Sequence, residues 1–183
     1  MAKFEKVSRF ADVDFDMPAR KTMYSAGYDF VVAEDIIIEP CESLINEIFW
    51  EYGDRSGVSE VEPVSLDEMA ALTKRAQAKP TLVSTGVKCQ LAEDQYLQLS
   101  VRSSCPLKNW LIMANGVGII DSDYYNNPDN EGEIFFQIIN LSPLPIYLKR
   151  GDRIGQGIIM KYDRTEDDVA VDQRTGGFGS TNA

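Results

Sequence analysis

The sequence predicts an all-β fold with the short strands of a jelly roll or a β-barrel. Segments rich in β-branched and aromatic residues recur along most of the chain, and Gly, Asn or Pro residues separate them. Several of these segments alternate between apolar and polar residues, which is typical of strands with one buried face. One region, residues 41–80, departs from this pattern. Many short strands with turn residues between them favour a barrel or a sandwich of sheets.

The predicted strands follow one another along the chain. The first lies within residues 28–40 and ends at a proline, and two more lie within residues 81–91 and 93–104. Residues 109–121 hold two apolar runs around Asn115-Gly116, a dipeptide that favours a tight β-hairpin. Residues 132–143 and 144–163 supply the remaining strands.

Residues 41–80 indicate a partly helical insertion within a single domain of residues 1–183. Ser65 and Glu68 match a capping box, and apolar residues follow them at roughly helical spacing. The stretch "SLINEIFWEYG" before them is consistent with a second short amphipathic helix. Three roles stay open for this insertion: a buttress for the β fold, a contact between subunits, or a surface for another protein.

The composition excludes several classes of function. The 18 basic and 29 acidic residues give a net charge of −11, which opposes binding to a nucleic-acid backbone. The absence of histidine excludes Ser-His-Asp and Cys-His catalysis and histidine-ligated zinc. The apolar runs are too short to cross a membrane. Three widely spaced cysteines and a charged N-terminus favour a cytoplasmic protein with reduced thiols.

Four segments carry polar residues at the ends of predicted strands. Asp29 lies at a strand start, Arg102 and Ser103 follow a strand, Asp121 ends an apolar run, and Gln156 follows a turn. Each segment alone is explained equally well or better as an ordinary turn or strand end. A planar guanidinium beside hydroxyl groups nevertheless suits phosphate oxygens, and a carboxylate at the end of a buried run is held rigidly enough to act as a general base.

The C-terminal segment "RTGGFGST" raises a different question. Its three glycines add no packing surface and are costly to order, yet they surround one large aromatic residue, Phe178. This composition predicts a flexible arm, residues 173–183, that becomes ordered when it closes over a ligand.

Together these segments resemble the motif set of the trimeric deoxyuridine triphosphatases (dUTP pyrophosphatases) of phages and Gram-positive bacteria. The motifs "AGYDF", "RSS", "NGVGIIDSDY", "GDRIGQ" and "RTGGFGST" stand in the order of that family, from about residue 24 to residue 181 apart from the insertion. The resemblance implies a jelly-roll-like distorted β-barrel and a homotrimer whose active sites draw on all three chains. It also implies hydrolysis of dUTP to dUMP and pyrophosphate with Mg²⁺, which limits uracil incorporation into DNA and supplies dUMP for thymidylate synthesis.

The resemblance also implies a role for individual residues. Asp121 would be the catalytic base that activates the water attacking the α-phosphorus, and Asp29 would hold Mg²⁺ through water. Tyr124 would stack beneath the deoxyribose and exclude a 2′-hydroxyl, and Phe178 would lie on the uracil bound at another subunit. The implied substrate-binding residues are Arg102, Ser103, Ser104, Asn115, Gly118, Ile120, Tyr124, Gln156, Arg174, Phe178, Gly179, Ser180 and Thr181.

The chain departs from the family pattern after Tyr124, where residues 125–132 form a longer segment for which we predict no role. Cys105 lies near the predicted phosphate site, and we expect a small packed thiol there and not a nucleophile. Two alternatives to a dUTP pyrophosphatase stay open. One is a deoxycytidine triphosphate deaminase of the same fold, expected to carry a glutamate in place of Asp121 and no C-terminal arm. The other is a nucleotide-sensing protein that regulates a repressor.

Overall fold

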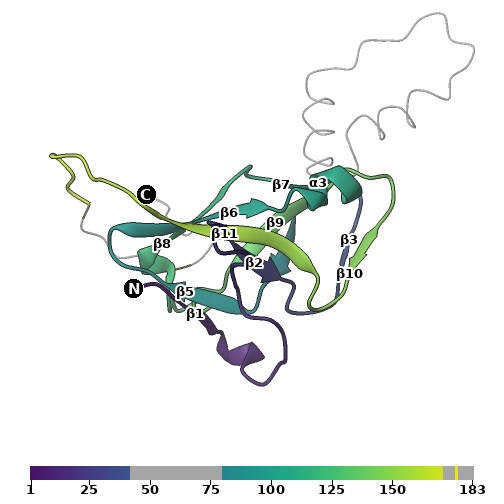
Figure 1. Ribbon diagram of the computed structural model, residues 1–183, viewed down its shortest axis with the longest axis horizontal. Helices are drawn as coiled ribbons and strands as arrows, with labels where there is room; N and C mark the ends of the chain where they lie inside the picture. Colours follow the sequence, from purple (N-terminus) through teal and green to yellow (C-terminus); the bar gives the residue numbers. More distant parts are fainter. Residues whose placement is uncertain (42–79, 171–175, 177–183) are drawn as a thin grey trace, which may run out of the picture.

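The computed structural model of the protein describes residues 1–41, 80–170 and 176, so the predicted helices of the insertion lie outside the described residues. Short β-strands dominate these residues, as predicted (Figure 1). The elements are β1 (Lys3–Lys6), η1 (Ser8–Phe10), β2 (Tyr28–Val31), β3 (Ile36–Ile38), β4 (Thr81–Ser84), β5 (Val87–Gln90), β6 (Gln95–Val101), α3 (Ser104–Asn109), β7 (Leu111–Met113), β8 (Gly118–Asp121), η2 (Ser122–Tyr124), β9 (Phe135–Asn140), β10 (Ile146–Leu148) and β11 (Arg153–Lys161).

The described strands form antiparallel sheets and no closed barrel. The largest sheet has the order β2-β11-β6-β8, and a second sheet has the order β4-β9-β7. Two further pairs, β1-β5 and β10-β3, extend the structure at its edges. Figure 1 shows the long strand β11 running across the molecule between β2 and β6. This central strand joins the segments that carry the predicted phosphate-binding residues.

The hydrophobic core lies beneath the two larger sheets. Burial alternates along strand β9, with Phe136, Ile138 and Asn140 buried and their neighbours partly exposed, although its sequence FFQIIN does not alternate between apolar and polar residues. The rings of Phe30 and Phe136 meet edge to face, with their centroids 5.8 Å apart. Burying one such side chain contributes about 2 kcal/mol, so the apolar faces of these strands supply most of the driving force for folding.

The predicted hairpin around Asn115-Gly116 is wrong. Gly116 does form a turn, with φ of +68°, and its N–H donates to the carbonyl of Met113 at 3.1 Å. However, β7 pairs with β9, whereas β8 pairs with β6. The turn therefore connects two different sheets, because each flanking strand finds a longer partner elsewhere. The short helix α3 was not predicted from the sequence.

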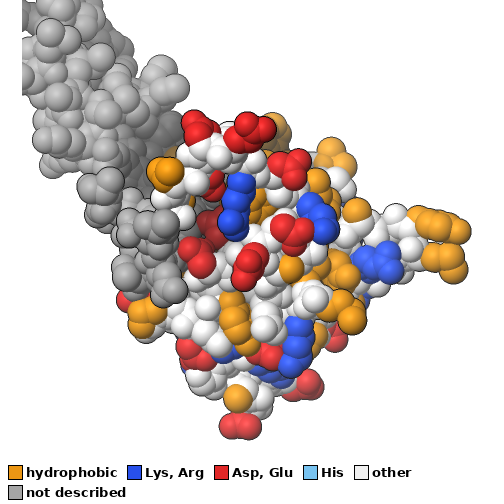
Figure 2. Space-filling model, turned by 90° about the vertical axis from the view of Figure 1, so that its left-hand side faces the viewer, with side chains coloured by type: hydrophobic (Ala, Val, Ile, Leu, Met, Phe, Trp, Pro, Cys, Tyr) orange, Lys and Arg blue, Asp and Glu red, His pale blue; other side chains and the backbone are white. Residues whose placement is uncertain are grey.

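The surface agrees with the negative charge of the sequence. Figure 2 shows acidic side chains spread over the face at the left-hand side of Figure 1, with basic side chains among them. Among the described residues, no helix has the length and apolar character needed to span a membrane.

Candidate functional site

Asp29 lies between two arginines from different parts of the chain. Its Oδ1 atom is 3.4 Å from Nε of Arg102, which follows β6, and its Oδ2 atom is 3.4 Å from Nη1 of Arg153, which begins β11. The Asp29 side chain is 13% exposed, whereas those of Arg102 and Arg153 are 32% and 49% exposed. The carboxylate therefore holds two guanidinium groups that still face solvent. This arrangement suits the binding of phosphate oxygens, to which arginine can donate two parallel hydrogen bonds.

Gln156 lies beside this cluster. In the sheet it is paired with Asp29 on one side and with Ser100 on the other, and its Nε2 atom is 3.4 Å from the Ser100 Oγ. A β-carbon on Gly27 would lie only 2.5 Å from the Gln156 Oε1. Glycine at position 27 thus leaves the space that the Gln156 amide occupies, so the segments "AGYDF" and "GDRIGQ" pack directly against each other.

Ser103 and Ser104 lie next to Arg102, at the start of α3. Ser103 is exposed and Ser104 is partly exposed, so both can reach a ligand. Cys105 follows them but is buried, and its thiol contacts the carbonyl of Ile154 at 3.1 Å. Burial raises the pKa of the Cys105 thiol, which keeps it protonated near neutral pH. The prediction of a packed thiol is therefore confirmed.

The segment from Asn115 to Ile120 presents its backbone and only some of its side chains. Asn115 is exposed at the turn, whereas Gly118 is buried and Ile120 is 7% exposed. The part of this segment that is open to a ligand is therefore residues 115–117 and Ile119. That this segment reads the edge of a base through its N–H and carbonyl groups stays a prediction.

Asp121 ends β8, partly exposed, and lies opposite Tyr96 of β6. Tyr124 follows in η2, and its ring is 5% exposed and belongs to the core. Asp121 thus lies at the surface close to a tyrosine that the fold holds almost completely buried. A ligand could touch only a small part of the Tyr124 ring.

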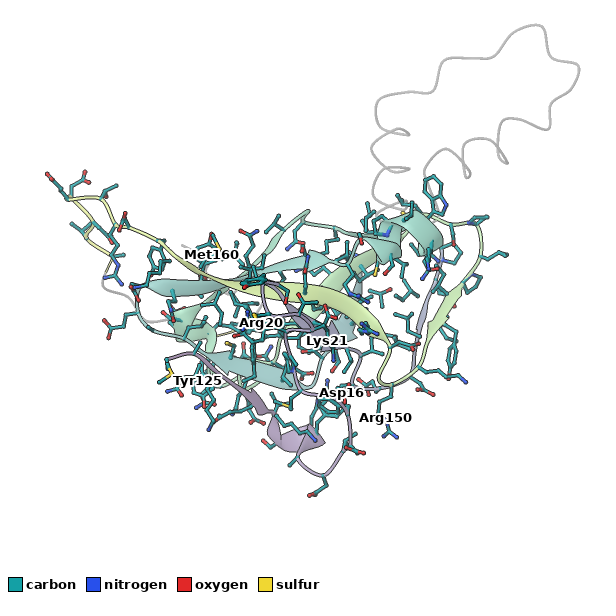
Figure 3. The ribbon with its side chains drawn as sticks, in the orientation of Figure 1. Asp16, Arg20, Lys21, Tyr125, Arg150 and Met160 are labelled. Atoms are coloured by element: carbon teal, nitrogen blue, oxygen red, sulfur yellow. The ribbon has the colours of Figure 1, made fainter. Side chains whose placement is uncertain are left out.

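The strand register separates Asp121 from the arginine cluster. Paired residues in antiparallel strands point to the same face, so the outer face of the β2-β11-β6-β8 sheet carries both groups. Asp121 of β8 lies opposite Tyr96 of β6, whereas Asp29 of β2 lies at the level of Ser100, four residues further along β6. In addition, β2 and β8 are three strand spacings apart in this sheet. Standard strand spacings make this a separation of about 19 Å. Met160, in the same row as Asp121, lies toward the end of the molecule from which the C-terminal segment extends (Figure 3).

One chain therefore brings Asp29, Arg102, Ser103, Ser104 and Gln156 together but keeps Asp121 apart from them. The predicted arm residues Arg174, Phe178, Gly179, Ser180 and Thr181 lie outside the described residues.

The described residues offer no complete set of protein ligands for a metal ion. No three Cys, Asp or Glu side chains within 1–41 and 80–170 lie close enough to hold one together. Both oxygens of Asp29 already face arginine nitrogens. A carboxylate has about four lone-pair sites, so Asp29 can still accept a hydrogen bond from water bound to a magnesium ion that takes its other ligands from phosphate.

Sequence reasoning assigned no role to two residues of this cluster. Arg153 was noted only as part of its motif, and the ion pair with Asp29 depends on the pairing of β2 with β11. Ser100 could have been found from the alternation of β6, since it shares a face with Gln98 and Tyr96. Asp152, by contrast, accepts a hydrogen bond from the N–H of Lys149 at 2.9 Å and has the ordinary turn role that its sequence favours.

Comparison with known proteins identifies relatives over the whole chain. The family model described as dUTPase matches residues 66–182. The deoxyuridine 5′-triphosphate nucleotidohydrolase of Lactococcus lactis subsp. lactis is 32% identical over 182 residues, which cover 98% of this chain and 97% of the relative.

Solved structures agree with these relatives. The dUTPase from Streptococcus mutans matches with a TM-score of 0.65 and 32% identity, over 89% of this chain and 98% of that chain. The dUTPase of Staphylococcus bacteriophage 80alpha, at 16% identity, has a TM-score of 0.59 over 95% of this chain and 98% of that chain, and shows a likeness of fold alone. The predicted jelly-roll-like fold is confirmed by these structures.

Proposed function

This chain belongs to the dUTPase family, and we propose that it hydrolyses dUTP to dUMP and pyrophosphate. The observation that carries the proposal is the match to the Lactococcus lactis deoxyuridine 5′-triphosphate nucleotidohydrolase over almost the full length of both chains. The local geometry supports it, because two arginines and a glutamine around Asp29 supply hydrogen-bond donors suited to phosphate oxygens. In the cell, this reaction limits uracil incorporation into DNA and provides dUMP for thymidylate synthesis.

In the proposed mechanism, Asp121 accepts a proton from the water that attacks the α-phosphorus. Arg102, Arg153 and Gln156 bind the triphosphate and stabilise the charge that develops on its oxygens. Ser103 and Ser104 add hydroxyl donors at the same surface. Asn115 and the backbone of Gly118 and Ile120 select uracil, and Tyr124 selects the deoxyribose.

We propose Mg²⁺ as the cofactor, held by the triphosphate and by Asp29 through water. Bound in this way, the ion supplies positive charge that offsets the charge of the triphosphate. A solved dUTPase structure from Staphylococcus aureus phage phi11 is described as containing a structural Mg(II) ion, although that chain is only 17% identical to this one.

We propose a homotrimer with shared active sites, and the separation of Asp121 from the arginine cluster supports the sharing of sites between chains. Because about 19 Å divides the two groups on one sheet, Asp121 reaches the triphosphate only when another copy docks on this outer face. The same face exposes Ile119 and Met160, whose side chains are 52% and 39% exposed. The arm with Arg174, Phe178, Gly179, Ser180 and Thr181 then closes over the nucleotide.

A pyrophosphate-release assay tests the proposed function. Purified protein should release pyrophosphate from dUTP with Mg²⁺ and should release no ammonia from dCTP. The variant Asp121→Ala should lose turnover and still bind dUTP, because it removes the base and leaves the phosphate-binding cluster intact. Ammonia release from dCTP would instead support the deaminase alternative.

A regulatory role toward a repressor stays a prediction. A structure of the bacteriophage 80alpha enzyme is described with the statement that phage dUTPases control transfer of virulence genes by a G protein-like mechanism. At 16% identity, that likeness concerns the fold of this chain. We expect no binding to nucleic acid and a cytoplasmic location.

A further inference from the structure

Residues 125–132, the segment that is longer than the usual family pattern, fold back onto Tyr124. The Nδ2 of Asn127 donates to the Tyr124 carbonyl at 2.9 Å and to the Oδ1 of Asn130 at 2.8 Å. Gly132 has φ of +80°, and a β-carbon there would lie 2.5 Å from the Tyr124 carbonyl oxygen. The loop therefore begins and ends against the backbone of Tyr124.

The hydroxyl of Tyr124 has a partner on each side. It accepts a hydrogen bond from the Nδ2 of Asn130 at 2.8 Å and donates one to the carbonyl of Glu133 at 2.9 Å. The Oδ1 of Asn130 in turn accepts from Asn127 and from the N–H of Gly132 at 3.0 Å. Asn130 thus connects the tyrosine ring directly to the backbone of the loop.

The loop is itself fastened to the N-terminal segment and to β5. The Tyr125 hydroxyl donates to a carboxylate oxygen of Glu5, at the end of the molecule where β1 and β5 lie (Figure 3). Glu131 accepts from the N–H of Ser8 at 3.2 Å and forms an ion pair with Lys88 at 3.3 Å. Because these contacts hold both sides of the loop, it cannot simply move with the Tyr124 ring.

We propose that Asn130 is a positioning residue for Tyr124 and that it thereby increases selectivity for deoxyribonucleoside over ribonucleoside triphosphates. This inference rests on the proposed function. An aromatic ring excludes one extra hydroxyl only if it cannot retreat from it, and steric selectivity therefore requires a rigidly held ring. With only 5% of Tyr124 exposed, a small displacement would change all of its contact with a sugar.

The test compares kcat/KM for dUTP and for UTP in four proteins: the wild type, Asn130→Ala, Tyr124→Phe and the double variant. Each single variant removes the hydroxyl-to-amide hydrogen bond, and the ratio of dUTP to UTP should fall by about tenfold. Tyr124→Phe also removes the hydrogen bond to the Glu133 carbonyl, and Asn130→Ala also removes the bonds of Asn130 with Asn127 and Gly132. Because the two variants share one lost hydrogen bond, the double variant should lose less than the product of the two single losses. Pro128→Ala, in the same loop but exposed, is the matched control and should keep the wild-type ratio.

If Asn130→Ala lowers kcat/KM for dUTP and for UTP by the same factor, their ratio is unchanged. Asn130 then has only a general structural role, and the proposal is overturned. Additive losses in the double variant would also overturn it. If Asn130→Ala fails to fold, Asn130→Asp carries the test, since a side-chain oxygen remains to accept from Asn127 and Gly132 and the amide that donates to the Tyr124 hydroxyl is gone. If the wild type releases no pyrophosphate from dUTP, the proposed function fails. The positioning role is then read by calorimetry from the relative affinities for dUTP and UTP of the wild type and of Asn130→Ala.

Discussion

Mixing two inactive variants tests whether one active site takes its residues from more than one chain. Asp121→Asn removes the proposed base and leaves the arginine cluster unchanged. Arg102→Ala removes a phosphate-binding guanidinium and leaves Asp121 unchanged. Each variant alone should show almost no pyrophosphate release from dUTP.

The expected recovery follows from the strand register. A base that activates water on a phosphate must lie within about 3 Å of that water, whereas about 19 Å separates Asp121 from Asp29 in one chain. If Asp121 and Arg102 come from different chains, random assembly of equal amounts leaves both residues intact in about a quarter of the sites. Activity should therefore return to about a quarter of the wild-type value.

The assay unfolds and refolds the two variants together and measures pyrophosphate release. Each variant refolded alone is the control, and native mass spectrometry establishes that mixed trimers have formed. Mixed trimers without activity above that of the controls would mean that one chain supplies both residues, and the argument from the sheet register would be wrong.

Three further predictions concern single positions. Gly27→Ala should lower kcat/KM for dUTP by about tenfold or more in steady-state assays, because the new β-carbon displaces the Gln156 amide; an unchanged rate would exclude this role for Gly27. Arg9→Met should lower the free energy of unfolding in urea by about 2 kcal/mol, because it removes the cation 2.9 Å from the buried Glu133 carboxylate; unchanged stability would show that the remaining donors suffice. Burial raises the pKa of the Cys89 thiol from 9.0 to about 12. Between these two pH values the unfolded chain has lost the thiol proton and the folded chain keeps it, so the free energy of unfolding falls by about 1.4 kcal/mol for each unit by which the pH rises. Cys89→Ala should remove that part of the slope in alkaline denaturation curves, and identical slopes would contradict it.

The strands could be predicted because their signal is local. The partial alternation in β6 and the β-branched residues around β2 and β3 indicate strands, whatever those strands pair with. The prediction of a hairpin at Asn115-Gly116 was wrong because strand pairing is not a local property. The turn itself is local, but the partners of β7 and β8 are strands that lie elsewhere in the sequence.

The candidate site shows the same division. Asp29, Arg102 and Gln156 were predicted from their motifs, and the structure brings them together. The contribution of Arg153 was not predicted, and the network of Asn127 and Asn130 around Tyr124 was not predicted either. These contacts need a particular strand register or loop conformation, which no spacing in the sequence specifies.

Local patterns thus specified the strand segments, the polar residues at their ends and, through motif resemblance, the nucleotide chemistry, because each of these is encoded within a few neighbouring residues. The tertiary structure alone decided that Asp29 holds an arginine 124 positions away and that Asp121 stands on the same sheet face but out of reach. The physical reason is that antiparallel pairing sets distances between side chains by register and strand order, and these depend on how the whole chain buries its apolar faces.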